Sequence, residues 1–341
     1  MPEPSFLLAL VHHFSHPRVG MVQARWGHLN RDYSLLTRVQ AILLDGHFVI
    51  EHAARHLAGR FFNFNGTAGI WRRACIESAG GWQADTLTED LDLSYRAQLL
   101  GWRFVYAPEV VVRAELPADI DAFRSQQRRW ARGSIETARK ILPRLLGARL
   151  PLGVKIEALF HLTANASYVL MVALSILMVP AMIIRRDAGF EMLLLLDLPL
   201  VLLSVLSVGA FYLVSQREIG REWRSTVRLL PSLMALGIGL ALNNARGVLL
   251  ALFGKRREFM RTPKHDLRGT RGEWRLKRYQ APRSRPLTAL EILLGIFFTG
   301  AALEAALAGK LASLPVLLLF QAGFLYPAFL SLLRTTVGKT S

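Results

Sequence analysis

The spacing of apolar residues divides the chain at about residue 150. Before that point, short runs with helical periodicity alternate with short β-rich runs bounded by Gly, Pro or Asn. Such alternation is typical of an α/β domain with a largely parallel sheet. The expected helices cover residues 4–14, 34–57, 75–79, 91–100 and 119–141, and the expected strands cover residues 19–26, 61–71, 103–106 and 110–115.

Beyond about residue 152 the chain becomes strongly apolar. Four runs are each long enough to cross about 30 Å of hydrocarbon. A fifth apolar stretch, residues 229–253, contains Asn243, Asn244 and Arg246 near its middle, where a charge in lipid is costly. The four expected spans are residues 157–184, 190–214, 289–308 and 311–333.

The loop at 254–288 is basic, and the positive-inside rule therefore puts it in the cytosol. If this loop acts on a site in residues 1–150, the two must lie on one side of the membrane. Two spans already return the chain to that side, so residues 229–253 are expected to form an interfacial or re-entrant helix. The sequence predicts a multi-pass protein of the cell (inner) membrane whose catalytic part is cytosolic.

The composition agrees with a membrane protein. The chain has 341 residues, 52% of them hydrophobic, and a formal net charge of +17. This charge suits anionic lipid or an anionic substrate. Nucleic acid is not an expected partner, because the densest basic run lies between hydrophobic spans. The single Cys75 excludes an intrachain disulfide.

Candidate chemistry is concentrated between residues 88 and 130. Thr88 is a favourable N-cap, and the carboxylates of Glu89 and Asp90 follow in the first helical turn, where the helix dipole is expected to keep Asp90 ionised. Further on, Gln126, Arg129 and Trp130 stand at i, i+3 and i+4, so they share one helix face. Acidic first turns usually serve only as caps, and an Arg-rich helix face is usually just solvated. Their order, and the hydrophobic spans that follow, make a functional interpretation stronger.

Thr88-Glu89-Asp90 followed by Gln126-x-x-Arg129-Trp130 resembles the TED and QxxRW signatures of processive family 2 glycosyltransferases. These are the membrane-embedded synthases of cellulose, mannan, hyaluronan and related β-glycans. The resemblance covers nearly the whole chain and is closest to the cellulose-synthase-like glucomannan and mannan synthases. Three further stretches agree with it: Val22–Trp26, Phe64–Gly69 and Phe259–Lys264, the last similar to a cytosolic gating loop.

The resemblance implies a role for each motif. Asp90 is the expected catalytic base, oriented by Glu89 and Thr88. Trp130 is expected to stack on the terminal acceptor sugar, while Gln126 and Arg129 contact diphosphate or sugar hydroxyls. The remaining candidates are Asn65, Gly66 and Thr67 in a turn beside the acceptor, and Phe259, Arg261, Thr262 and Lys264 in the gating loop.

The family resemblance also exposes a missing part. Its members carry an Asp-x-Asp that holds Mg or Mn and the diphosphate, in a nucleotide-binding half that precedes the segment similar to residues 2–14. The Asp-x-Asp strings at 90–92 and 119–121 occupy helix starts, and His52 and His56 fit no known zinc pattern. No metal ligands are therefore expected in this chain. Residues 1–150 are interpreted as the C-terminal half of a glycosyltransferase-A-type (Rossmann-like) domain, with the N-terminal half missing or supplied by another polypeptide, and residues 151–341 as the membrane domain.

The expected function is that of an inverting β-glycosyltransferase. It would transfer hexose from GDP-mannose or UDP-glucose to a growing polysaccharide, with the membrane spans as its exit path; an accessory subunit is a possible partner beside the membrane lipids. Two alternatives stay open. One is a non-processive family 2 enzyme that glycosylates a lipid, and the other is a catalytically inactive, truncated membrane protein.

Overall fold

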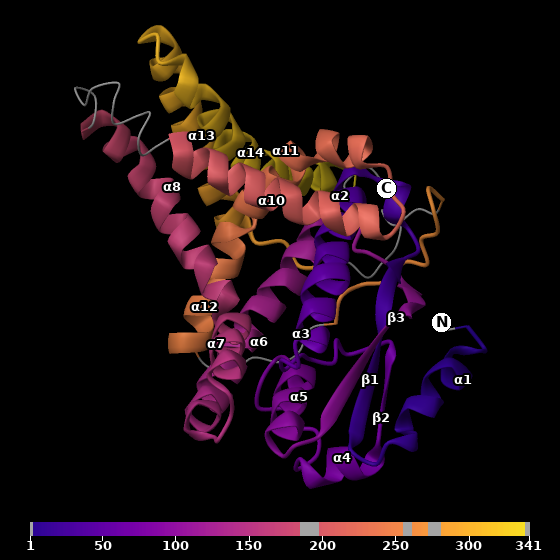
Figure 1. Cartoon of the computed structure of the whole chain (residues 1–341). Helices are drawn as coiled ribbons and strands as arrows, with labels where there is room; N and C mark the ends of the chain where they lie inside the picture. The colour runs from indigo at the N-terminus through magenta and orange to yellow at the C-terminus, as the bar shows by residue number, and fades with distance from the viewer. Residues whose placement is uncertain (1–2, 185–197, 255–260, 272–280, 338–341) are drawn as a thin grey trace.

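A computed structural model describes residues 3–184, 198–254, 261–271 and 281–337 of the chain. Figure 1 shows a lower unit, in which helices surround a small sheet, and an upper group of long helices. The helices of the first unit are α1 (Phe6–Val11), α2 (Leu35–Asp45), α3 (Ala53–Leu57), α4 (Arg73–Ser78), α5 (Glu89–Leu99) and α6 (Ile120–Gly147), with short helical turns η1 (His12–Ser15), η2 (Arg31–Tyr33) and η3 (Gly46–His52).

A three-stranded sheet forms the centre of the first unit within the described ranges. Its middle strand β1 (Val19–His28) pairs in parallel with β3 (Arg103–Ala114) and antiparallel with β2 (Gly69–Trp71). The sheet is therefore mixed. The expected α/β class is confirmed, whereas the expected parallel arrangement holds for one of the two strand pairs.

The expected strand at 61–71 pairs with β1 only over residues 69–71. Its earlier backbone amides bond to side chains instead of a neighbouring strand. Those of Phe62, Phe64 and Asn65 donate to Gln98 Oε1, Ser94 Oγ and Gln23 Oε1, at 3.2, 2.9 and 3.0 Å. These three amides are thus satisfied without strand pairing.

Two short strands were expected on either side of Pro108, and the structure has one strand. Its partner positions on β1 shift between Ala24, opposite Ala107, and Arg25, opposite Val111. Proline has no N–H to give to a ladder, so a bulge at this point removes the conflict. The Pro108 carbonyl accepts a bond from Arg25 Nε at 3.1 Å.

The long helix expected at 34–57 is helical throughout but changes its winding. Ser34 caps α2 by a capping box with Thr37. The π-helical turn η3 then separates α2 from α3. Phe48 of this turn is buried with Met21, Phe62 and other side chains against the sheet. The π-helical turn therefore contributes Phe48 to the core packing of the first unit.

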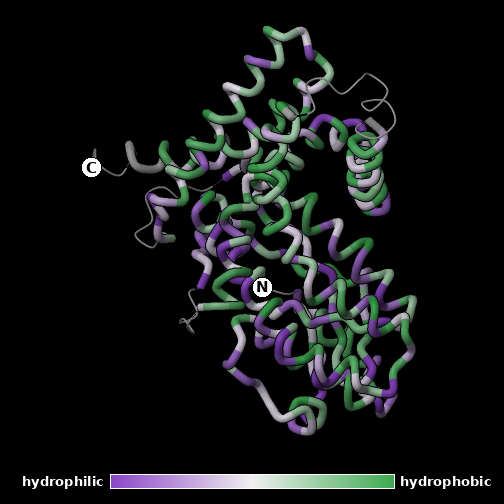
Figure 2. The backbone as a smooth tube through the Cα atoms, turned by 90° about the vertical axis from the view of Figure 1, so that its left-hand side faces the viewer, coloured by the Kyte–Doolittle hydropathy of each residue, from purple (hydrophilic) through white to green (hydrophobic). Residues whose placement is uncertain are grey.

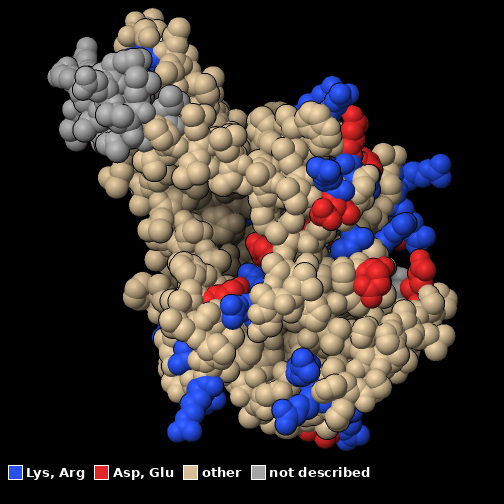
Figure 3. Space-filling view, viewed as in Figure 1, with Lys and Arg blue, Asp and Glu red and all other residues tan. Residues whose placement is uncertain are grey.

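The second half of the chain consists of long apolar helices. Five segments are long and apolar enough to cross a membrane: residues 152–183, 199–218, 223–253, 285–307 and 311–333. Their large apolar side chains include many that face outward, such as Leu203 at 68% and Leu307 at 82% exposed. Figure 2 shows the apolar character of these helices, and Figure 3 shows a part of their surface, at the upper left of the view, with almost no charge. The chain is a membrane protein.

The helices of this second half are α7 (Leu152–Thr163), α8 (Ser167–Ile184), α10 (Leu198–Glu218), α11 (Trp223–Gly239), α12 (Ala241–Phe253), α13 (Arg285–Leu307) and α14 (Leu314–Val337), with η4 (Ala164–Ala166) and η7 (Leu311–Ser313) between them.

The ambiguous stretch at 229–253 divides at Leu240 into α11 and α12. Asn243 and Asn244 are fully buried, and Asn243 Nδ2 donates to the Arg124 carbonyl of α6 at 2.8 Å. The two asparagines are therefore sheltered from lipid by protein. Half of this segment is buried, more than in any of the other four candidate spans.

Close packing of α12 on α6 gives a first prediction. A Cβ on Gly247 would lie 2.8 Å from the Arg128 carbonyl oxygen, whereas a Cβ on Gly237 in α11 would meet nothing within 4 Å. We expect Gly237→Ala to leave stability unchanged or raise it by up to about 1 kcal/mol, and Gly247→Ala to lower it. Thermal unfolding of the purified protein in detergent measures both, and equal shifts in the two variants would contradict this packing.

Candidate active site

Asp90 lies at the start of α5, where a glycine turn passes directly beside its carboxylate. A Cβ on Gly66 would be 3.1 Å from Asp90 Oδ2, and Gly66 has a φ of +75° that favours glycine. Asp90 Oδ1 accepts a hydrogen bond from the Leu91 amide at 2.8 Å. The structure thus brings the Thr88–Asp90 motif and the 65–67 turn together, although they are far apart in the sequence.

Burial dominates the electrostatics of Asp90. Desolvation raises the pKa of its carboxyl group, Glu89 adds to this, and the Leu91 amide and the Arg129 charge oppose it. The result is a pKa of about 7. The expectation that the helix start keeps Asp90 firmly ionised is therefore wrong, because loss of water outweighs the dipole of one helix turn.

The turn at 65–67 is held by a buried glutamine. Gln23 of β1 accepts from the Asn65 amide at 3.0 Å and donates to the Thr67 and Ala68 carbonyls at 3.1 and 3.0 Å. Its side chain is completely buried. Residues 22–26 resemble a stretch of the family, but that resemblance did not predict that the Gln23 side chain holds the 65–67 turn by hydrogen bonds.

Helix α6 packs directly on the start of α5. A Cβ on Gly133 would lie 2.5 Å from Thr88 Cγ2, so only glycine permits this approach. Thr88 stands at the N-cap position, but its hydroxyl makes no capping bond and instead lies 3.2 Å from Thr137 Oγ1 of α6. The Thr88 hydroxyl therefore does not cap α5 as expected, and it joins α5 to α6 instead. Glu136 reinforces the contact by accepting from the Leu87 amide at 3.0 Å.

This packing brings Arg129 close to the acidic motif. Burial lowers the pKa of the Arg129 guanidinium, and the charges of Glu89 and Asp90 act in the opposite direction. Gln126 and Trp130 are half-buried and share the α6 face of Arg129 by their spacing. A carboxylate and a guanidinium in one partly desolvated place can accept a proton and stabilise an anion.

The described part of the gating motif meets the same helix. Arg129 Nη2 donates to Thr262 Oγ1 at 3.2 Å. Lys264 is tied down by the Glu115 carbonyl at 2.5 Å, and burial lowers its pKa while the Glu115 charge opposes this. Arg261 is exposed beside this segment and contributes to the lowered Lys264 pKa, and Phe259 lies outside the described residues.

Glu115 is a further residue that the motif comparison did not identify. Its carboxylate accepts hydrogen bonds from the amides of His265 and Asp266, at 2.9 and 2.8 Å to the nearer oxygens. The loop after Lys264 is therefore fixed on the end of β3. The sequence offered no signal for this, because a lone Glu at a strand end has no distinctive pattern.

A divalent metal does not fit the carboxylates of the described ranges. No group of three or more His, Cys, Asp or Glu side chains gathers there. Asp92 is paired with Arg96 at 2.8 Å and with Lys140 at 3.0 Å. Asp119 caps α6, and Asp121 pairs with Arg124. Three of the four aspartates in the two Asp-x-Asp strings are thus engaged in contacts within the protein.

Comparison with known proteins gives one family match and several relatives. The model of glycosyl transferase family group 2 matches residues 1–213. Probable glucomannan 4-beta-mannosyltransferase 7 of Oryza sativa subsp. japonica is 48% identical over 149 residues, which are 43% of this chain and 26% of that protein. Glucomannan 4-beta-mannosyltransferase 2 of Arabidopsis thaliana is 47% identical over 142 residues, 41% of this chain and 27% of its own length. Probable glucomannan 4-beta-mannosyltransferase 4 of Oryza sativa subsp. japonica is 40% identical over 177 residues, 52% and 32% of the two chains. The chain spans only about a quarter to a third of these curated relatives.

The raised pKa of Asp90 gives a prediction that needs no substrate. Between the unfolded value and about pH 7 the folded state holds a proton that the unfolded chain releases, so stability falls as pH rises through this window. Asp90→Asn removes the titration. We expect it to raise the free energy of unfolding by roughly 1–4 kcal/mol at pH 8 and by little at pH 4.

The matched control is Glu77→Gln, which alters an exposed carboxylate on α4 whose partner is Arg73. Its effect on stability should be small at both pH values. Thermal unfolding in detergent at pH 4 and pH 8 gives the comparison. A loss of stability in Asp90→Asn at pH 8 would show that the carboxylate is stabilised by its surroundings rather than strained by burial.

Proposed function

Since the chain belongs to glycosyl transferase family group 2, we propose that its first unit forms the acceptor side of an inverting β-mannosyltransferase site. One observation carries the proposal: the 65–67 turn and the charge of Arg129 both lie beside Asp90, and Arg129 also donates a hydrogen bond to Thr262. The relatives are named as glucomannan 4-beta-mannosyltransferases, that is, as enzymes that transfer mannosyl units. GDP-mannose is therefore the proposed donor, and a β-linked polysaccharide is the proposed acceptor.

In the proposed step an acceptor hydroxyl oxygen attacks the anomeric carbon of the donor. The bond from that carbon to the diphosphate breaks, its electron pair leaves with the diphosphate, and the hydroxyl proton passes to Asp90. A carboxyl group with a pKa near 7 is a better proton acceptor than an ordinary aspartate. Arg129 supplies positive charge for the departing anion, and Gln126 contributes a hydrogen bond.

The indole of Trp130 completes the acceptor site in this proposal. An indole offers an apolar face to the C–H face of a pyranose, while the neighbouring amide and guanidinium satisfy the hydroxyl groups at its edge. Thr262 and Arg261 lie on the loop that would cover the diphosphate, and Lys264 anchors that loop to Glu115. Closure of such a loop excludes water, which would otherwise hydrolyse the donor.

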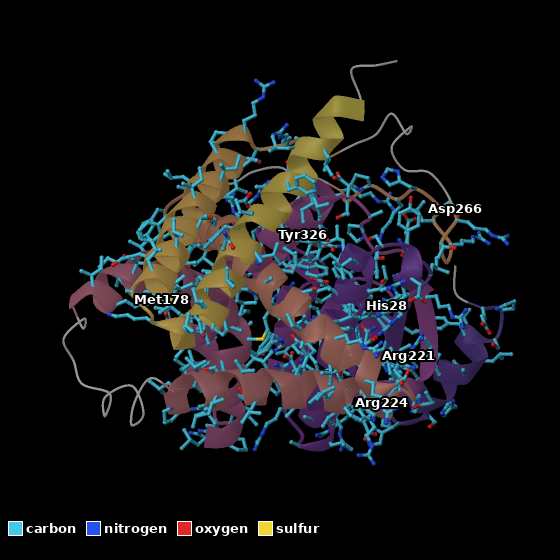
Figure 4. All side chains as sticks on the ribbon, turned by 90° about the horizontal axis from the view of Figure 1, so that it is seen from above. His28, Met178, Arg221, Arg224, Asp266 and Tyr326 are labelled. Carbon is cyan, nitrogen blue, oxygen red and sulfur yellow. The ribbon has the colours of Figure 1, made fainter. Side chains whose placement is uncertain are left out.

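Contacts before and after the segment 223–253 support a cytosolic site and four membrane crossings. Near the end of α10, Gln216 donates to Asp45 of the first unit at 3.0 Å. After α12, Gly269 donates to the Leu29 carbonyl at 2.8 Å. The segment 223–253 between these loops thus begins and ends beside the first unit, which favours an interfacial or re-entrant path. In Figure 4, seen from above, Arg221 and Arg224 lie on the same side of the molecule as His28, opposite Met178 of α8.

The reaction is tested in washed membranes that contain the protein. We expect label from GDP-mannose to enter an insoluble polymer in preference to label from UDP-glucose. Asp90→Asn should lower the rate by roughly 10²–10⁴-fold, the usual worth of a general base, while Glu77→Gln should not. Polymer synthesis at the normal rate in Asp90→Asn would refute the role of Asp90, and label that extracts into organic solvent would indicate a lipid acceptor instead.

The topology is tested with single introduced cysteines, since native Cys75 is buried. With four crossings, Lys310→Cys between α13 and α14 should react with a membrane-impermeant maleimide in intact cells. Arg221→Cys should react only after permeabilisation. If residues 223–253 cross the membrane, Lys310→Cys will be protected in intact cells, and the four-span arrangement is wrong.

A further inference from the structure

The turn at 65–67 has a second support besides Gln23. His47 belongs to the π-helical turn η3, and its Nε2 lies 3.2 Å from Asn65 Nδ2. Its other ring nitrogen, Nδ1, lies 2.9 Å from Glu51 Oε2. A line of hydrogen bonds therefore leads from the turn beside Asp90 through an imidazole to a carboxylate. π-Helical turns occur frequently at functional sites.

The charge of Glu51 fixes the proton on one side of the imidazole. Burial acts to raise the pKa of Glu51, but the hydrogen bonds from His47 and Arg55 and the charge of Arg55 outweigh it and keep the pKa below its usual range. Glu51 is ionised at neutral pH, so it only accepts hydrogen bonds. Nδ1 of His47 must then carry a proton and donate to it.

The tautomer of His47 determines how the Asn65 amide is turned. In the neutral ring with a proton on Nδ1, Nε2 holds a lone pair and accepts from the Asn65 NH2 group. Turning the amide by 180° would place Asn65 Oδ1 against that lone pair, which is repulsive. His47 and Glu51 together therefore direct the NH2 group of Asn65 inward and leave its carbonyl oxygen for another partner.

That carbonyl oxygen is buried and has no hydrogen-bond partner among the described residues. An acceptor that is buried without a partner is destabilising. The same turn contacts the Asp90 carboxylate through Gly66. A group that donates a hydrogen bond to Asn65 Oδ1 would thus come from a ligand held next to Asp90.

We propose that Asn65 Oδ1 accepts a hydrogen bond from a hydroxyl group of the acceptor sugar, and that His47 and Glu51 are positioning residues that keep this oxygen turned toward the sugar. The inference rests on the proposed transferase function, and it adds a specific acceptor contact to it. His47 makes no contact with the reacting atoms in this arrangement. Its variants should therefore alter the use of acceptor more than the use of donor.

The ring packing of His47 allows a selective test. Its imidazole meets the rings of Phe48 and His52 at centroid distances of 5.1 and 4.7 Å, so phenylalanine can replace it without leaving a cavity. His47→Phe keeps this packing and removes the hydrogen bonds. His47→Gln keeps an amide oxygen that can accept from Asn65. His56→Phe is the matched control, because His56 is another histidine that packs edge-on against an aromatic ring, that of Phe62.

The experiment measures initial rates in washed membranes with labelled GDP-mannose, varying a manno-oligosaccharide acceptor and then the donor. We expect His47→Phe to raise the KM for the acceptor about 5–10-fold, the worth of one hydrogen bond to a neutral group, with the KM for GDP-mannose unchanged. His47→Gln should restore most of the acceptor affinity, and His56→Phe should match the parent protein. Thermal unfolding of each variant shows whether it is folded.

The outcomes separate this inference from the function on which it rests. If Asp90→Asn is inactive while His47→Phe keeps the parent KM for the acceptor, the positioning role is wrong and the transferase function stands. An equal rise in the KM of donor and acceptor would also overturn the role, because it would indicate general damage to the site. If Asp90→Asn is fully active, the proposed function itself fails.

Discussion

The arrangement of the candidate site depends on one close contact between two helices. Gly133 of α6 approaches Thr88 so closely that a single methyl group would lie 2.5 Å from the threonine side chain. This contact sets the distance between the start of α5, with its carboxylates, and the face of α6 that carries Arg129. Real Cβ contacts do not become so short, so any larger residue must push α6 away. The pairing of a proton acceptor with a cationic group thus rests on steric exclusion.

The opposing effects of burial and charge at Asp90 follow from this packing. Water is displaced by α6 and by the 65–67 turn, which raises the pKa of the carboxyl group, while Arg129 lowers it less than burial raises it. Under the proposed function, an anionic diphosphate beside Arg129 would offset the guanidinium charge. The carboxylate would then hold a proton more tightly while donor is bound. Each ionised Asp90 would then be a stronger proton acceptor, but a smaller fraction of Asp90 would be ionised at neutral pH.

Local sequence patterns predicted most elements of the first unit, and less of how those elements join. Helix periodicity identified α2 through α3 and α5, and the run from 119 marked the start of α6, capped by Asp119. The antiparallel placement of β2 could not be derived, because the residues before it bond through the amides of positions 62, 64 and 65 to the side chains of Gln98, Ser94 and Gln23. Such side-chain to backbone bonds join residues distant in sequence and leave no periodic signal.

The site residues also divide into those that sequence motifs identified and those that only the structure reveals. The acidic motif, the α6 face and the turn were identified from their resemblance to known signatures, and the structure brings Asp90, Gly66, Arg129 and Thr262 together. The residues that support them, Gln23, Glu115 and His47, were not identified as such. Each acts through one buried or partly buried hydrogen-bonding group, whose value depends on what the fold places opposite it. The raised pKa of Asp90 was likewise not foreseeable, because it arises from burial by segments 24 residues before and about 40 residues after it.

Helix α6 also connects the site to the membrane helices. In its first turns Asp121 accepts from Ser331 of α14 at 3.1 Å, Arg124 pairs with Glu291 of α13, and the Arg124 carbonyl accepts from Asn243 of α12. These buried polar groups would be costly if separated, because each would lose a partner where water cannot replace it. The start of α6 is therefore fixed to three apolar helices, and its later turns to α5. A displacement of the membrane helices would be transmitted along one rigid helix to Arg129, so the geometry around Asp90 depends on the membrane part as well as on the sheet.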